Sequence, residues 1–173
     1  MHETREDIAR LDELIERSFT AAGPHLLSIA TPERRLGGRD LSLRLAGMSL
    51  LALATVTSDG RPIVGAVDGI FYRGSFHFSS SRDSLRYRHL AARPRVSATH
   101  LPGEHLAVTV HGRAVQIDLD GAPERGLRDC VLGVYLPRYG DEFLKLLQSG
   151  VVYWRIDAER MFTFSAPGPG LDG

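Results

Sequence analysis

The sequence predicts a small, mainly β domain, either a barrel or an α+β fold, with helices at its margins. One observation is a series of short apolar segments between residues 48 and 119, each bounded by turn-forming residues. A second is the helical spacing of apolar residues before and after that region. A length of 173 residues, of which 43% are hydrophobic and 24% charged, suits one globular domain over residues 1–173.

The N-terminal region predicts one long helix and a connector. Residues 4–20 place four apolar side chains at helical spacing, namely Ile8, Leu11, Ile15 and Phe19. Thr4, followed three residues later by Asp7, resembles a weak capping box at the start of this helix. Prolines and glycines interrupt the pattern over residues 23–46, so we expect a connector there, with a short helix around 41–45.

The next region predicts a three-stranded meander. Segments 50–57, 62–72 and 75–79 are apolar or alternate between apolar and polar residues, as strands do. The pair Asp59–Gly60 favours a tight hairpin turn, and Arg73–Gly74 marks the second turn. Three consecutive antiparallel strands therefore begin the sheet.

A short helix and two more strands follow. Residues 80–92 lose the two-residue period and end before Pro94, as a helix usually does. Strands are expected over 95–101 and 106–119, and the second is long enough to bend at Gly112.

The C-terminal region predicts a helical insertion and the closing strands. Apolar residues at helical spacing indicate helix over 123–148. A last pair of strands is expected over 151–157 and 161–165, and the tail at 166–170 is expected to be loose.

The charge balance excludes some classes of function. The chain has 21 basic and 21 acidic residues, so it lacks the excess positive charge of a protein that binds many nucleic-acid phosphates. Its one cysteine, Cys130, cannot form an internal disulfide, which suits a reducing compartment. Nothing resembles a signal peptide or a membrane-spanning run. We therefore expect a soluble, cytoplasmic protein that binds neither nucleic acid nor a membrane.

The most informative segment for function is 79–95. It holds four serines where a strand gives way to a helix, and residues 82–95 hold five arginines and one acid. Unpaired N–H groups at a helix start and a planar guanidinium both suit a phosphate. The segment is too short for a nucleic-acid track, so it favours one phosphate of a small ligand. The alternative is a solvated helix face with Ser80 or Ser81 acting only as the N-cap.

The order of these motifs resembles the pyridoxamine 5'-phosphate oxidase-like family, the FMN-binding split barrels. The motifs that carry the resemblance are Leu53–Pro62, Gly74–Ser80, Ser84–Arg86, His89–Val96 and Tyr153–Met161. The resemblance implies a six- or seven-stranded antiparallel split β-barrel with peripheral helices, built from about 48–119 and 151–165. It leaves both terminal helical regions unexplained.

The resemblance also implies a cofactor site and a homodimer. The FMN phosphate would be held where the third strand meets the helix, by Ser80, Ser84, Leu85 and Arg86. The flavin ring would lie along the second strand, mainly against backbone groups of Gly65, Ala66, Val67 and Asp68. The family commonly has Lys at the position of Arg86, and Arg keeps the charge.

The sequence departs from the oxidases themselves, which carry an arginine near the position of Gly65 and a basic substrate-phosphate site near the C-terminus. We therefore expect an FMN-binding oxidoreductase that acts on another small redox substrate. A reductase that uses the deazaflavin coenzyme F-420 is the alternative enzyme, and a flavin- or haem-binding protein without catalysis is the other. Hydride transfer to a flavin needs no acid or base from the protein, so no catalytic residue is predicted.

Other candidate sites give weaker signals. His77 alternates with Phe76 and Phe78, so it faces either a ring cofactor or the wetter side of the sheet. Three histidines lie across the hairpin of the fourth and fifth strands, but they lack a metal-ligand spacing and no metal is predicted; they are His100, His105 and His111. Cys130 lies on an apolar helical stripe and is expected to be a buried, inert thiol.

Overall fold

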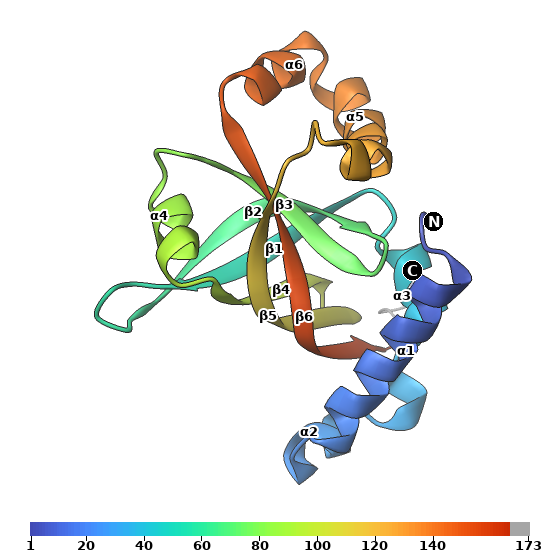
Figure 1. The fold of residues 1–173 in the computed structure, drawn as a ribbon. Coiled ribbons are helices and arrows are strands. Elements are labelled where there is room, and N and C mark those ends of the chain that lie inside the picture. The colour runs from blue at the N-terminus through green and yellow to red at the C-terminus, as the bar shows by residue number, and fades with distance from the viewer. Residues whose placement is uncertain (167–173) are drawn as a thin grey trace, which may run out of the picture.

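The computed structural model describes residues 1–166 and forms a closed barrel of six antiparallel strands in the order β1-β2-β3-β6-β5-β4 (Figure 1). The strands are β1 (Met48–Val56), β2 (Pro62–Tyr72), β3 (Ser75–Ser81), β4 (Arg95–Gly103), β5 (Leu106–Ile117) and β6 (Val151–Ser165). The antiparallel barrel predicted from the sequence is confirmed, with β1 to β3 as the expected meander.

The closing strand corrects one expectation. The predicted pair of strands at 151–157 and 161–165 is one continuous strand, β6, that pairs with β5 along its length. The register shifts where His111 pairs with Arg160 but Gly112 pairs with Ala158, so one extra residue is accommodated as a bulge. A Cβ atom at Gly112 would lie 2.1 Å from the carbonyl oxygen of Asp157. Gly112 therefore permits the bend that the sequence predicted there.

The helices lie outside the barrel wall and at its ends. They are α1 (Arg5–Thr20), α2 (Pro24–Ile29), α3 (Gly38–Arg44), α4 (Leu85–Ala92), α5 (Arg125–Tyr139) and α6 (Asp141–Gln148), with short 3₁₀ turns at Pro32–Arg34 and Ala122–Glu124. The expected connector at 23–46 thus contains two short helices. The tail predicted at 166–170 lies almost wholly outside the described residues. None of the helices in the described part of the chain is long and apolar enough to cross a bilayer.

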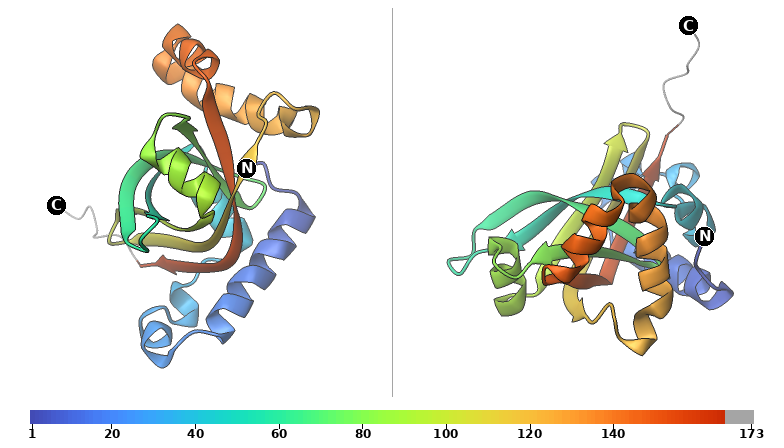
Figure 2. Two further views of the ribbon diagram at one scale, coloured as in Figure 1. Left: turned by 60° about the vertical axis from the view of Figure 1, so that its left-hand side comes forward. Right: turned by 90° about the horizontal axis from the view of Figure 1, so that it is seen from above.

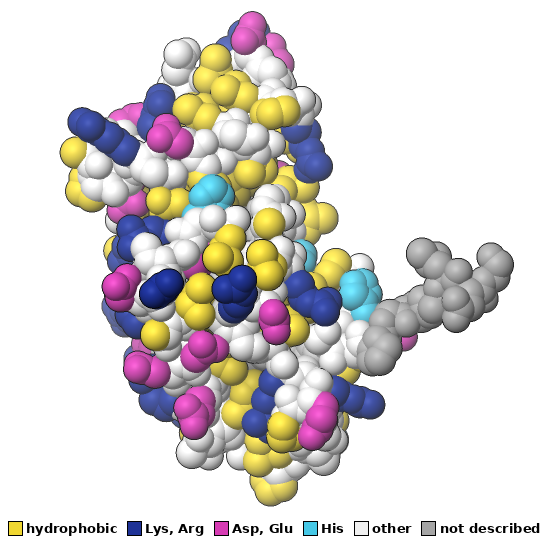
Figure 3. All heavy atoms as spheres, turned by 90° about the vertical axis from the view of Figure 1, so that its right-hand side faces the viewer, with side chains coloured by type: hydrophobic (Ala, Val, Ile, Leu, Met, Phe, Trp, Pro, Cys, Tyr) yellow, Lys and Arg dark blue, Asp and Glu magenta, His cyan; other side chains and the backbone are white. Residues whose placement is uncertain are grey.

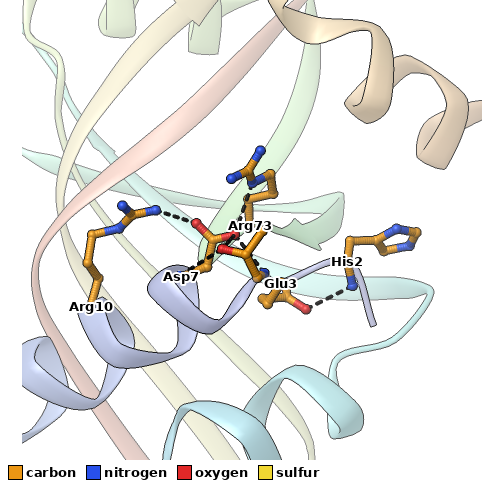
Figure 4. Close-up of polar contacts among 6 residues, drawn as sticks. His2, Glu3, Asp7, Arg10 and Arg73 are labelled. Atoms are coloured by element: carbon orange, nitrogen blue, oxygen red, sulfur yellow. Dashed lines mark hydrogen bonds and ion pairs between the residues drawn. The ribbon is translucent and has the colours of Figure 1, made fainter.

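A buried carboxylate holds α1 against the barrel (Figure 4). The predicted capping box is present, because Thr4 and Asp7 exchange hydrogen bonds at the start of α1. Asp7 is 2% exposed. It accepts a hydrogen bond of 3.0 Å from Nε of Arg73, which lies in the turn between β2 and β3. It also forms an ion pair with Arg10. Burial alone raises the pKa of Asp7, but the hydrogen bonds from Thr4 and Arg73 outweigh it and lower that pKa below its usual value.

Two hydrophobic clusters lie on opposite faces of the barrel wall. The inner cluster fills the barrel and includes Leu51, Phe76, Phe78 and Trp154, and residues of α1, α3 and α4 join it at the ends of the barrel. Figure 2 shows α4 over one opening of the barrel, where Leu90 is 1% exposed. The outer cluster lies between the wall and α5–α6, which form a separate layer in Figure 1.

The face that carries α1 and α5 mixes basic and acidic side chains (Figure 3). The two charge types are interspersed there, in keeping with a net charge of zero. This face therefore offers no continuous positive track of the kind that nucleic acids require.

Candidate cofactor site

Serines fix the junction between β3 and α4. Ser84 is the N-cap of α4, because its Oγ accepts a hydrogen bond of 3.0 Å from the backbone N–H of Tyr87. The same hydroxyl lies 2.7 Å from Oγ of Ser80 and donates to the carbonyl oxygen of Ser81 over 2.8 Å. The N-cap is therefore Ser84, so the alternative in which Ser80 or Ser81 caps the helix is wrong. The helix begins at Leu85, later than predicted, because β3 runs on to Ser81.

Arg86 connects the start of α4 to β2. Its Nη2 donates a hydrogen bond of 3.1 Å to the carbonyl oxygen of Ala66. A Cβ atom at Gly65 would lie 3.0 Å from the same Nη2, so the guanidinium occupies the space beside a residue without a side chain. Partial burial lowers the pKa of Arg86, but a guanidinium keeps its charge at any physiological pH. Among the described residues the bond to Ala66 is the one hydrogen bond that the guanidinium makes, so four of its five N–H donors remain for a ligand.

A cavity of about 230 Å³ opens at this junction. Its walls come from β1, β2 and α4, namely Leu53, Thr55, Ile63, Gly65, Ser84, Leu85, Arg86 and His89. Because the first turn of a helix leaves its N–H groups without intrahelical partners, the backbone of Leu85 and Arg86 adds donors beside the guanidinium. The cavity thus combines a fixed cation, a hydroxyl and a helix start, which together suit a phosphate.

The structure brings together six of the eight residues predicted for the cofactor. Gly65, Ser84, Leu85 and Arg86 line the cavity. Ala66 and Ser80 are tied to it by hydrogen bonds to Arg86 and Ser84. The other two lie elsewhere, because Val67 is 6% exposed in the barrel core and Asp68 faces outward into a different cavity.

Sequence reasoning missed two polar residues of this cavity. Oγ1 of Thr55, which is 3% exposed, lies 3.0 Å from Nδ1 of His89. His89 is three residues after Arg86, so helical spacing places both on one face of α4 and could have identified it. Thr55 comes from β1, and nothing in its local sequence indicates this pairing.

His77 and Cys130 are both buried. His77 faces away from Phe76 and Phe78, as predicted, but it is 3% exposed and its ring lies against that of Tyr72, with centroids 6.1 Å apart. Cys130 is buried, as expected, and burial raises the pKa of its thiol. Over residues 1–166, no three His, Cys, Asp or Glu side chains are grouped closely enough to hold a metal ion.

The model of the pyridoxamine 5'-phosphate oxidase family matches residues 43–142, more than half of the chain. The chain belongs to this family. The match begins just before β1 and ends in the first turn of α6. It therefore includes the whole cavity between β1, β2 and α4, whereas β6 and the N-terminal helices of this family member lie outside it.

Solved structures share the fold of this pyridoxamine 5'-phosphate oxidase family member at low sequence identity. A conserved hypothetical protein from Mycobacterium tuberculosis has a TM-score of 0.65 and 18% identity, over 82% of this chain and 96% of that one. An FAD-binding protein from Mesorhizobium loti has a TM-score of 0.56 and 23% identity, over 78% of this chain and 98% of that one. HutZ, a haem storage protein from Vibrio cholerae, has a TM-score of 0.57 and 20% identity, over 73% of this chain and 91% of that one. No protein of curated function matches the sequence.

Proposed function

We propose that this protein is an FMN-binding oxidoreductase whose flavin phosphate is held at the start of α4. The proposal rests on the position of Arg86. Its half-buried guanidinium lies over Gly65 and beside the N-cap of α4. A partly buried cation with unused N–H donors is a suitable partner for an anion. A phosphate at this point would accept from the guanidinium, the first N–H groups of α4 and the hydroxyl of Ser84.

When bound, FMN supplies the electron-transfer chemistry, and the chain supplies position and electrostatics. Ala66 and Asp68 lie next along β2 from the phosphate-binding end, with outward-facing side chains. The flavin ring is expected to extend along this strand against its backbone. Because the ribityl chain joins the phosphate to the ring, holding the phosphate limits how far along β2 the ring reaches.

We do not propose that the protein is itself a pyridoxamine 5'-phosphate oxidase. Gly65 stands where the oxidases carry an arginine, and the space next to it is taken by the guanidinium of Arg86. The positive charge at this point therefore comes from α4 alone. The substrate of the protein is accordingly a different small molecule, which exchanges electrons with the flavin.

We also propose that the protein is a homodimer. The outer face of β1 and the adjoining part of β2 carry exposed apolar side chains, with Leu50 57% and Val64 65% exposed. Leu101 on β4 is also 63% exposed. A second copy would bury this surface next to the cofactor cavity. Sedimentation of the unmodified protein at micromolar concentration tests this, and a monomeric mass there would overturn it.

The deciding experiment is a titration of the cofactor-free protein with FMN, with coenzyme F-420 and with haem, in separate samples. Ligand fluorescence or absorbance and the melting temperature are followed together, because a ligand that binds the folded state alone raises that temperature. Saturable FMN binding supports the proposal. Binding of F-420 alone assigns the deazaflavin alternative, and binding of haem alone assigns a haem-binding protein.

A further inference from the structure

A second cavity, of about 330 Å³, lies between the outer face of the barrel and the α5–α6 layer. Its walls come from β2, β3, β6 and the two helices, namely Asp68, Ser79, Tyr135, Tyr139, Glu142, Phe143, Leu146 and Tyr153. Its size and its mixture of aromatic walls with a few polar groups are those of small-molecule sites. The cofactor cavity uses none of these residues.

Aromatic rings form one wall of this cavity. The ring of Tyr135 stacks on Phe143, with centroids 4.9 Å apart, and on Tyr139, with centroids 6.2 Å apart. Tyr135 and Phe143 are buried, whereas Tyr139 is 48% and Leu146 47% exposed. The stack therefore begins in the hydrophobic cluster and continues to an apolar rim that is open to solvent. A flat ring entering from solvent can extend this stack.

The charged groups that line the cavity are both carboxylates, Asp68 and Glu142. Glu142 is paired with Lys145, whose Nζ lies 2.6 Å from its Oε1. Among residues 1–166, no Lys, Arg or His nitrogen lies within 4.0 Å of the Asp68 carboxylate. Burial chiefly, and then the charge of Asp68, raise the pKa of Tyr135, so the phenol stays neutral beside a carboxylate.

We propose that this cavity binds a planar aromatic molecule that carries a positive charge, with its ring on the Tyr135–Tyr139 stack and its charge beside Asp68. Aromatic faces attract cations, and an unpaired carboxylate next to them adds a direct Coulombic partner. An anionic molecule of the same shape would meet Asp68 and Glu142 with no cation in the wall.

The position of Asp68 links this cavity to the cofactor. Asp68 is two residues along β2 from Ala66, whose carbonyl oxygen binds Arg86, and both side chains face outward. Two residues of a strand span about 7 Å. A ring that extends along β2 from Arg86 would therefore end beside the occupant of the cavity. With FMN bound in this way, the occupant of the cavity is the redox substrate. This assignment rests on the proposed function, whereas the binding of a planar aromatic cation does not.

The test uses the full, cofactor-free chain and three molecules of one shape: 1-naphthylmethylamine, 1-naphthalenemethanol and 1-naphthoate. Affinities are measured by titration calorimetry at pH 7 and low salt. The amine is expected to bind about fivefold more tightly than the neutral alcohol, the effect of one partly exposed charge pair with an aromatic face. The carboxylate is expected to bind most weakly.

Variants locate the site. Asp68→Asn is expected to remove the preference for the amine and to leave the affinity for the alcohol unchanged. Tyr139→Ala is expected to lower the affinity for all three molecules. Asp40→Asn, on the exposed face of α3, changes the net charge equally and is the matched control, with unchanged affinities. Equal affinities for the three molecules, or a preference that survives in Asp68→Asn, would overturn the proposal.

The same protein sample is titrated with FMN, which separates the two proposals. Binding of the amine without binding of FMN overturns the proposed function and leaves the cavity assignment intact. Binding of FMN without any preference for the amine overturns the cavity assignment alone.

Discussion

The strands β2, β3 and β6 have two buried faces that are covered in different ways. Their inner faces meet other strands around the barrel, and Phe76, Phe78 and Trp154 are 1–3% exposed. Their outer faces are covered by α5 and α6, which are joined at Gly140 in a left-handed conformation. Two helices can cover this surface without filling it, and an open aromatic cavity remains. The comparison shows that a closed sheet completes a core, whereas an added layer leaves room for a ligand.

The largest expected effect contrasts one phenylalanine from each face. Phe78→Ala should lower the free energy of unfolding by about 3–5 kcal/mol, because the barrel cannot collapse into the space. Phe143→Ala should lower it by about 2 kcal/mol, because its neighbours border an open cavity and can relax. Urea denaturation monitored by the fluorescence of Trp154 measures both. Equal losses would contradict the difference between the two faces.

His77 makes the outer face sensitive to acid. Burial is the main cause that lowers the pKa of His77 from 6.5 to about 4. The folded state therefore binds this proton less readily than the unfolded state, so stability is full above pH 6.5 and is lost as the pH falls toward 4. The loss approaches about 3 kcal/mol at 1.36 kcal/mol for each unit of pKa shift. His77→Gln should remove this part of the pH dependence between pH 6.5 and 4.5, and an unchanged profile would contradict it.

Arg86→Ala tests whether the two cavities are independent. The loss of charge-assisted hydrogen bonds to the phosphate should weaken FMN binding by about 2 kcal/mol, while naphthylmethylamine affinity stays the same. Arg88→Ala is the matched control, since Arg88 is exposed on the same helix and does not line the cavity. Equal losses of FMN affinity in both variants would point to general electrostatic attraction instead of a site at Arg86.

The smallest effect concerns the helix that carries Arg86. Ser84→Ala removes the acceptor for the N–H of Tyr87 and should lower the free energy of unfolding by about 1 kcal/mol. Thr4→Ala, which removes the cap of α1, is the comparison in the N-terminal region. Thermal denaturation followed by circular dichroism measures both, and a Ser84→Ala variant as stable as the wild type would contradict the capping role.

Most of the local structure could be predicted from the sequence. Alternating residues and the Asp59–Gly60 turn predicted β1 to β3, and helical spacing with the Thr4–Asp7 pair predicted α1, because these signals act between residues close in the chain. Part of the serine- and arginine-rich segment lines the cavity between β1, β2 and α4, and its role in binding a cofactor stays a prediction. The extra strand break expected in β6 was wrong, because the polar residues near Glu159 form a bulge whose fit depends on Gly112 in another strand.

Contacts between residues far apart in the chain depend on the tertiary structure and could not be predicted. The contact of Arg86 with Gly65 and Ala66 and the pairing of Thr55 with His89 join residues 20 to 34 positions apart. The same holds for His77, which the sequence allowed on the wetter side of the sheet but which is 3% exposed and lies against Tyr72 in the folded chain. Local propensity cannot encode such contacts, because they exist only once barrel closure has fixed which side of each strand faces inward.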